Sequence, residues 1–454
     1  MGDKRLFGDT EFYSTLLRLA VPMVMQQLVM NALNAVDVLM VGQLGDTAVA
    51  AVGLANQVWF LLNLFLFGVG SGSAIFTAQF WGRRDLANLR RMLGLALLLG
   101  VGGSVLFALA AIAIPEKILR LYSADPAVAA LGGRYLRIVG FCYAPTAITA
   151  MYGMILRSTR HVKIPMAVSI AALSFKTLLA YGLIFGLAGL PALGVIGAAI
   201  ATAVARTLEC AAMLLLTYCR NLPTAARPRE MLALDRDLLT RYARTSLPVV
   251  VGEILWSLGI TTYSAVYAHI GTGSVAAVSI ASTIENVAVV PFIALANACA
   301  IILGNQMGGG DTATAAGYAR RFLRLTIGGA LLVGLLIFVC RGPLLDYYRI
   351  SAEAQQDARG VLVVISAALW LKAANMMTIV GILRSGGDTR FALFADTAPL
   401  WFIGVPMALL GAFVLHLPVY FVVLMVMADE ATKFVLSIWR VLSGQWINSV
   451  VQAI

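Results

Sequence analysis

Charged residues and the side chains that most enzymes use are scarce in this sequence. Only 12% of the 454 residues are charged and 60% are hydrophobic, which excludes an ordinary water-soluble globule. The 3 histidines, His161, His269 and His416, are dispersed and leave a zinc site without a ligand set. A membrane-embedded enzyme would need a convergent Ser/His or metal-ligand set, and the sequence contains no such motif. We therefore expect neither an enzyme nor a zinc centre.

Paired cysteines and a cleavable leader are also missing. The 5 cysteines show no CxxC and no paired spacing, so they are expected to be small apolar packing residues. Residues 1–22 lack the short apolar core and small-residue cleavage site of a secretory leader. The first helix is therefore expected to stay in the mature protein.

Long apolar runs are abundant instead. Each has about 20 residues or more, enough to cross ~30 Å of hydrocarbon as a helix. This pattern predicts an all-α integral membrane protein with twelve transmembrane helices. The expected spans are residues 15–43, 47–81, 92–115, 131–156, 164–187, 193–219, 243–270, 274–306, 323–341, 357–384, 391–413 and 418–441.

Basic residues are distributed unequally between the connections. Alternate connections, beginning with residues 82–91, contain 18 Lys and Arg, whereas the intervening ones contain 6. By the positive-inside rule the first set is cytoplasmic, and so are both termini. We expect a multi-pass protein of the plasma membrane, which in a bacterium is the inner membrane. The net charge of +11 then reflects topology and contact with anionic lipid headgroups, and no nucleic acid partner is expected.

The sequence repeats itself. "VGQLGDTAVAAVGLANQ" from Val41 resembles "YAHIGTGSVAAVSIAST" from Tyr267, and the same shift of 226 aligns Pro22 with Pro248. Each half contains six expected spans, so the halves form a parallel repeat of two pseudo-symmetric six-helix lobes. The expected divisions are an N-terminal lobe at 1–219, a cytoplasmic linker at 220–241, a C-terminal lobe at 242–441 and a cytoplasmic tail at 442–454.

Two similar bundles favour a transporter. A cavity between them could open alternately to the two sides of the membrane if one half rocks against the other. The alternative is a static scaffold built by duplication.

Several further motifs follow one another along the chain. They are "VPMVMQQLVMNALNAVDVLMVGQLG", "GDTAVAAVGLANQ", "AQFWGRRD", "ILRSTR", "EILWSLGITTYSAVYAHIGTGSVAAVSIAST", "NACAIILGNQMGGGD", "ILRSGGDTRFALFAD" and "SGQWINS". In their order and spacing they resemble the multidrug and toxic compound extrusion (MATE) family, and the resemblance covers nearly the whole chain. The resemblance implies two six-helix lobes and export of organic compounds in exchange for protons or sodium ions. It implies no cofactor other than that coupling ion.

Asp37 is the leading candidate for ion coupling, because a carboxylate in hydrocarbon is costly unless it faces a cavity or a partner. The first span places its polar residues within an arc of about 140°, at about 100° per residue. They are Gln26, Gln27, Asn31, Asn34 and Asp37. Asp37 could instead be bonded to Asn34 or Lys176 only to hold packing.

A proline accompanies this carboxylate. Asp37 lies 15 residues after Pro22, as in the MATE proteins that the chain resembles, where the carboxylate is implicated in coupling and in bending the helix. Pro22 and its repeat partner Pro248 are expected to bend their helices. A sodium ion could use oxygens of Asp37, Asn34 and Asn31, whereas a proton needs only one carboxylate. We favour protons.

The C-terminal lobe has its own ionisable residues. Glu253, near Trp256, matches a coupling glutamate of many MATE relatives by looser spacing, and Glu285 is a further candidate for ion coupling. Lys372 could pair with Glu285 as a structural salt bridge. The expected residues of the substrate cavity are Gln27, Asn31, Lys176, Trp256, Tyr263, Lys372, Asn375, Met376 and Asp396.

Two other groups of charges are interpreted as local pairs without a transport role. They are Arg206 with Glu209, and Asp429 or Glu430 with Lys433, at helical spacing of three or four residues.

The main hypothesis is a monomeric, cation-coupled exporter of amphipathic organic molecules. The alternative within transport is a flippase for a lipid-linked oligosaccharide or related lipid. A ligand sensor without transport is a further hypothesis, and absence of flux in vesicles would favour it.

Overall fold

The computed structural model describes residues 10–451 except 188, 234, 347 and 349–350. Every regular element in this part of the chain is a helix, which confirms the predicted all-α class. The first 9 residues of the predicted N-terminal lobe and the last 3 of the predicted tail lie outside the described residues.

The helices group into two compact units. Of the described residues, 22–242 form one unit, and 10–21 together with 243–451 form the other. Each unit contains six long helical segments, in agreement with two six-helix lobes. The exact limits predicted for the lobes, the linker and the tail stay predictions.

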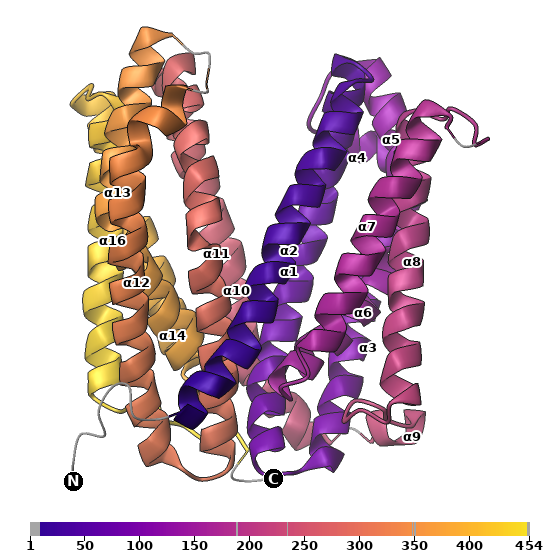
Figure 1. Ribbon diagram of the computed structural model, residues 1–454, viewed down its shortest axis with the longest axis vertical. Helices are drawn as coiled ribbons and strands as arrows, with labels where there is room; N and C mark the ends of the chain where they lie inside the picture. Colours follow the sequence, from indigo (N-terminus) through magenta and orange to yellow (C-terminus); the bar gives the residue numbers. More distant parts are fainter. Residues whose placement is uncertain (1–9, 188, 234, 347, 349–350, 452–454) are drawn as a thin grey trace. The chain divides into compact units, whose positions relative to one another are not determined.

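The first unit begins at Pro22 within α1, continues to α9 and ends at Tyr242 (Figure 1). The helices are α1 (Thr10–Gly42), α2 (Asp46–Gly82), α3 (Leu86–Ala113), α4 (Pro115–Arg120), α5 (Pro126–Gly140), α6 (Tyr143–Ser158), α7 (Lys163–Phe185), α8 (Val195–Cys219) and α9 (Pro228–Met231). Helix α2 packs against α3, α5 and α6, and α7 packs against α8.

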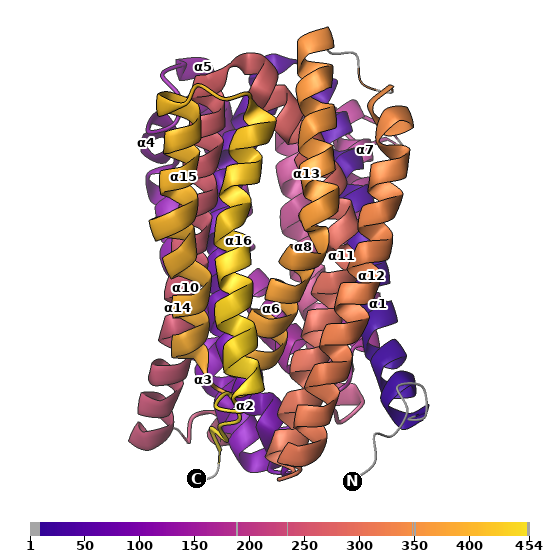
Figure 2. The same ribbon diagram turned by 90° about the vertical axis from the view of Figure 1, so that its left-hand side faces the viewer.

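The second unit is built from residues 10–21 of α1, the part of α10 that begins at Ala243, and the following helices to α16. In this unit α16 lies between α13 and α14 (Figure 2). The helices are α10 (Arg236–Ile270), α11 (Thr272–Gly308), α12 (Thr312–Asp346), α13 (Ala352–Met376), α14 (Thr389–Pro399), α15 (Val405–Leu409) and α16 (Val419–Leu442), with π-helical segments η1 (Met377–Leu383), η2 (Leu400–Gly404) and η3 (Leu410–Val414). Its core contains fully buried Leu362, Leu369 and Val422.

The twelve predicted spans all coincide with helical segments. Ten described helices are long and apolar enough to cross a membrane, and the pair α5 and α6 meets the test when taken together. That pair is bent by 52°, where one continuous span had been expected. The break has a local reason, since Pro145 in α6 cannot donate a helical hydrogen bond and its ring clashes with the carbonyl of Phe141. The remaining segment, α16, is not among these helices, and its apolar sequence is interrupted by Asp429, Glu430 and Lys433.

Both expected helix-bending prolines lie inside helices, Pro22 in α1 and Pro248 in α10. The contact boundary in α1 falls at Pro22. Before this point, Phe12 packs on Tyr318 and Phe322 of α12, with ring centroids 4.7 and 5.1 Å apart. Whether the prolines bend the helices during a functional cycle stays a prediction.

The sequence repeat is also a repeat of local structure. Asp85 caps α3 by accepting a hydrogen bond of 3.0 Å from the backbone N–H of Asn88. Its repeat partner Asp311 accepts one of 3.0 Å from the backbone N–H of Thr314 at the start of α12. Hydrogen bonds from the Thr314 hydroxyl and backbone N–H hold the pKa of the Asp311 carboxyl below its ordinary value. The shift of 226 residues therefore preserves the start of an equivalent helix in each unit.

One close contact between helices allows a test of the packing. A Cβ added at Gly334 in α12 would lie 2.4 Å from the Ser366 carbonyl oxygen in α13, a backbone atom that cannot move aside cheaply. Gly334→Ala is therefore expected to destabilise the protein by about 1–3 kcal/mol through overpacking. Thermal unfolding of the purified protein in detergent measures this loss.

Gly328 in the same helix is the matched control, because a Cβ there meets nothing within 4 Å. Gly328→Ala is expected to leave the unfolding temperature unchanged or slightly higher, since alanine favours a helix over glycine. Equal unfolding temperatures for the two variants would contradict the packing described for α12 and α13.

Candidate functional site

Asp37 is paired with Lys176. In the first unit the Lys176 Nζ of α7 donates to the Asp37 Oδ2 of α1 over 2.6 Å, and each side chain is 18% exposed. This confirms one alternative raised by the sequence, in which the lysine offsets the carboxylate. The other carboxylate oxygen, Oδ1, is buried without a hydrogen-bond partner among the described residues. The role of Asp37 in coupling stays a prediction.

The other polar residues of α1 differ in their burial, and of these Gln26 is buried. Gln27 donates to the Asn31 side chain over 3.0 Å, and Gln27 and Asn34 are exposed within the chain. The proposed sodium ligands Asn31 and Asn34 are therefore present on the same helix as Asp37, and their ligation of an ion stays a prediction.

A second buried pair lies deeper in the first unit. Glu209 of α8 is 4% exposed and accepts hydrogen bonds of 2.8 Å from both Arg206 and Ser169. The predicted local pair is thus present, with a serine of α7 as an additional donor. One cation and one donor compensate this carboxylate.

Glu253 and Glu285, the predicted coupling residues of the second unit, each contact one cation. Glu285 of α11 accepts from the Lys372 Nζ of α13 over 2.5 Å, the pairing left open by the sequence. Glu253 of α10 accepts from Arg384, directly after η1, over 2.8 Å. Sequence reasoning had associated Glu253 with Trp256 and missed Arg384. Trp256 is 40% exposed within the chain.

In the second unit, charged side chains cluster most closely around Lys433 of α16. Its Nζ lies 3.3 Å from Glu430 Oε1, 3.5 Å from Asp429 Oδ2 and 3.8 Å from Asp396 Oδ1. We call these four residues the Lys433 cluster. The Lys433 and Asp429 side chains are only 3% and 2% exposed. One lysine is therefore shared by three carboxylates in a buried environment.

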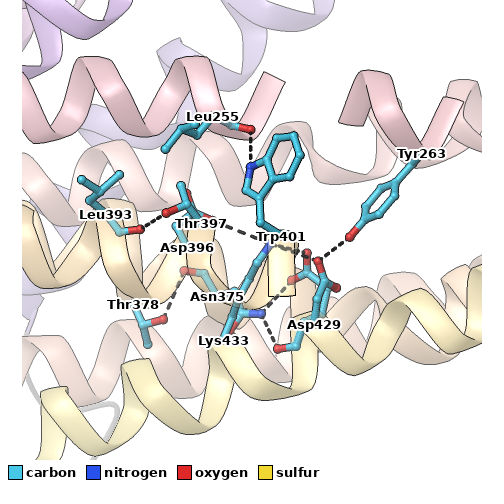
Figure 3. A network of polar contacts seen from close by, with 11 residues as sticks. Leu255, Tyr263, Asn375, Thr378, Leu393, Asp396, Thr397, Trp401, Asp429 and Lys433 are labelled. Atoms are coloured by element: carbon cyan, nitrogen blue, oxygen red, sulfur yellow. Dashed lines mark hydrogen bonds and ion pairs between the residues drawn. The ribbon is translucent and has the colours of Figure 1, made fainter. Parts of the chain in front are cut away.

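Neutral polar residues enclose the Lys433 cluster (Figure 3). The Tyr263 hydroxyl of α10 donates to Asp429 Oδ2 over 3.0 Å, and the Asn375 side-chain amide of α13 donates to Glu430 Oε2 over 2.7 Å. The tyrosine fits because residue 404 is glycine, since a Cβ there would lie 1.8 Å from the Tyr263 hydroxyl oxygen. Tyr263, Asn375 and Asp396, predicted separately for the substrate cavity, are thus brought together.

The local pairing predicted for Lys433 is present, but it is only part of the arrangement. Lys433 was interpreted as a local partner of Asp429 or Glu430, whereas it contacts both of them and Asp396 of α14 as well. Asp429, Glu430 and Lys433 are functional candidates that the sequence reasoning had set aside. The available signal was their position within one helical turn in the middle of an apolar run. Met376, also predicted for the cavity, is partly buried beside Asn375 at the end of α13.

Comparison with known proteins gives consistent results. A family model described as MatE matches residues 22–182 and 248–410, once in each repeat. The "Probable multidrug resistance protein NorM" of Rhizobium meliloti is 32% identical over 408 residues, which cover 86% of this chain and 84% of that protein. The protein of the same name in Bradyrhizobium diazoefficiens is 30% identical and covers 89% of this chain and 87% of its own length.

Solved structures show the same fold at lower identity. The structure titled "Crystal structure of MATE in the bent conformation" has a TM-score of 0.86 and 19% identity, and covers 97% of each chain. One titled "Crystal structure of MATE in the straight conformation" has a TM-score of 0.85 and 19% identity, and covers 95% of this chain and 96% of that chain. From the family model and the relatives that align over most of both lengths, the chain belongs to the MatE family of membrane transporters.

Proposed function

We propose that this protein exports amphipathic organic compounds across the membrane in exchange for a cation, by exposing its binding site alternately to the two sides. The observation that carries this proposal is the burial of ionisable pairs within apolar helices of both repeats. A charge within hydrocarbon costs several kcal/mol and marks an ion or substrate pathway more often than a structural site. Asp37 with Lys176 and Glu285 with Lys372 are such pairs.

The relatives support an organic substrate. Both NorM proteins are named as multidrug resistance proteins, and no relative reported above is named for a lipid-linked sugar. This favours export of organic compounds over the flippase alternative. The parallel repeat supports alternating access, because one repeat can rock against the other while each keeps its internal packing.

We propose the proton as the coupling ion. The Asp37, Glu253 and Glu285 carboxylates already have an ammonium or guanidinium group within 2.5–2.8 Å. A sodium ion would have to compete with this cation and assemble several further oxygen ligands. A proton needs only a carboxylate oxygen, such as the unpartnered Oδ1 of Asp37. No cofactor beyond this ion is part of the proposal.

The proposal includes a location and an assembly state. We place the protein in the inner membrane of a bacterium as a monomer, with both termini in the cytoplasm. The bacterial relatives and the excess of Lys and Arg in alternate connections support this placement.

One prediction of the proposed function concerns the driving ion. The purified protein is reconstituted into vesicles, and the flux of ethidium, a fluorescent organic cation, is measured under an imposed pH gradient and then under a sodium gradient. We expect flux that follows the pH gradient and is lost in Asp37→Asn, because an amide cannot take up the proton. Binding of ethidium to the purified variant is expected to persist.

Asp46→Asn is the control for this experiment, since Asp46 is an exposed carboxylate at the start of α2 in the same repeat. It is expected to transport as the wild type does. Flux that follows only the sodium gradient would contradict the assignment of the ion. Absence of flux in both gradients would contradict the proposed exporter.

Another prediction of the proposed function concerns orientation. Cys219 is exposed at the end of α8, next to a connection expected to be cytoplasmic. Cys340 lies near the C-terminal end of α12, next to a connection expected to be on the outer side of the membrane. In variants that retain only one of these cysteines, a membrane-impermeant maleimide added to intact cells is expected to label Cys340 alone. Cys219 should react only after the cells are permeabilised. The reverse pattern would show that the orientation is inverted.

A further inference from the structure

The charges of the second repeat do not balance. Glu285 has Lys372 as its cation and Glu253 has Arg384, so each of these carboxylates is compensated one to one. The Lys433 cluster contains the three carboxylates of Asp396, Asp429 and Glu430 against the one ammonium of Lys433. If all four groups were ionised, the cluster would have two uncompensated negative charges inside an apolar bundle.

The groups around the cluster only partly offset this charge. The Tyr263 hydroxyl of α10 donates to Asp429, and Tyr267 of the same helix is within electrostatic range of Asp429. Lys372 of α13 attracts Glu430 and Asp429 in addition to its own partner Glu285 of α11. On the side of α14, Asp396 is within electrostatic range of Arg384, which is bonded to Glu253, and of Glu253 itself. Lys372 is thus shared among three carboxylates and Arg384 between two. The surrounding helices therefore contribute two cations, Lys372 and Arg384, and two carboxylates, Glu285 and Glu253, so they bring no excess of positive charge to the cluster.

Two hydrogen-bond acceptor atoms at the Lys433 cluster lack a donor in the part of the chain that the structure describes. Asp429 Oδ1 and Asn375 Oδ1 are buried, and among the described residues neither has a hydrogen-bond partner. Asp429 and Asn375 are only 1% and 4% exposed. A buried acceptor without a donor destabilises the folded state, and a protonated carboxyl group in the cluster would supply a donor.

We propose that the Lys433 cluster is a proton-binding site, separate from the Asp37 pair and from the pairs of Glu253 and Glu285. A proton from the aqueous phase forms an O–H bond with one cluster carboxylate, no other bond breaks, and the excess charge falls from two to one. Lys433 already occupies the position between the carboxylates that a metal cation would need, so the site selects a proton. Three carboxylates that share one cation retain a proton more readily than a carboxylate with its own partner.

The cluster also connects several helices of the repeat. Its members lie on α14 and α16, and its hydrogen-bond partners lie on α10 and α13. Proton binding changes the attraction between four helices at once, which is what coupling requires, because a ligand shifts a conformational equilibrium only through unequal interaction with the two states. This coupling role, unlike the proton site itself, rests on the proposed function.

Infrared difference spectroscopy of the purified protein in lipid vesicles tests the site directly. A protonated carboxyl group has a carbonyl stretching band that an ionised carboxylate lacks. The wild type is expected to show this band at acidic to neutral pH and to lose it as the pH is raised. A proton on Asp37 would contribute to the band equally in every variant that keeps Asp37, so the cluster is identified by difference. Asp429→Asn, in which Lys433 faces two carboxylates instead of three, is expected to lose the part of the band that the cluster contributes.

Glu209→Gln is the matched control, because Glu209 is equally buried and has Arg206 as a partner of its own. It should keep the wild-type band. If Asp429→Asn does not yield a monodisperse protein, Asp396→Asn removes a cluster carboxylate from a different helix and is expected to have the same effect. Absence of the band in the wild type, or an unchanged band in both cluster variants, overturns the proposal.

Ethidium flux on the same preparations separates this proposal from the proposed function. Loss of the cluster's part of the band together with loss of pH-driven flux in Asp429→Asn supports both. If the band depends on Asp429 but the protein shows no flux, the proposed proton site is supported and the proposed export function is contradicted. If a cluster variant lacks this part of the band but keeps normal pH-driven flux, the proposed coupling role of the cluster is contradicted.

Discussion

The exclusion of uncompensated charge from hydrocarbon is the constraint on which this structure depends. Most of the chain is apolar because its helices must cross the bilayer, and each ionisable group within a span then needs a partner or a cavity. Most buried carboxylates meet this demand with one cation each, as Asp37 does with Lys176 and Glu209 with Arg206. Among the described carboxylates of the second unit, those of the Lys433 cluster are compensated incompletely.

The same constraint explains how the repeat has diverged. The helix starts are preserved, with Asp85 and Asp311 capping equivalent helices at a shift of 226 residues. The buried charges are not preserved, since position 37 aligns with Tyr263 and position 253 with Gln27. A cap needs only a local sequence, whereas a buried carboxylate needs a cation on another helix and therefore changes together with its surroundings. Each repeat thus has the same frame and a different set of ionisable groups.

The site illustrates how far spacing along one helix can mislead. Asp429, Glu430 and Lys433 fit the pattern of local pairs, and local pairing was the natural interpretation. The pairs do exist, but Asp396 of α14, Asn375 of α13 and Tyr263 of α10 approach the same turn of α16. A pattern along one helix shows which residues share a face, and it cannot show what the neighbouring helices bring to that face.

The sequence by itself determined the fold class, the twelve helical segments and the internal repeat. These follow from hydropathy and from self-similarity, which are properties of residues near one another in the chain or at a fixed shift. It also identified Asp37, Glu253 and Glu285 as buried carboxylates that need an explanation. Only the tertiary structure decided their partners, because Asp37 meets a lysine 139 residues away, Glu253 an arginine 131 away and Glu285 a lysine 87 away. Such pairings depend on how the helices pack side by side, and packing is set by contacts among many side chains rather than by the spacing of any two.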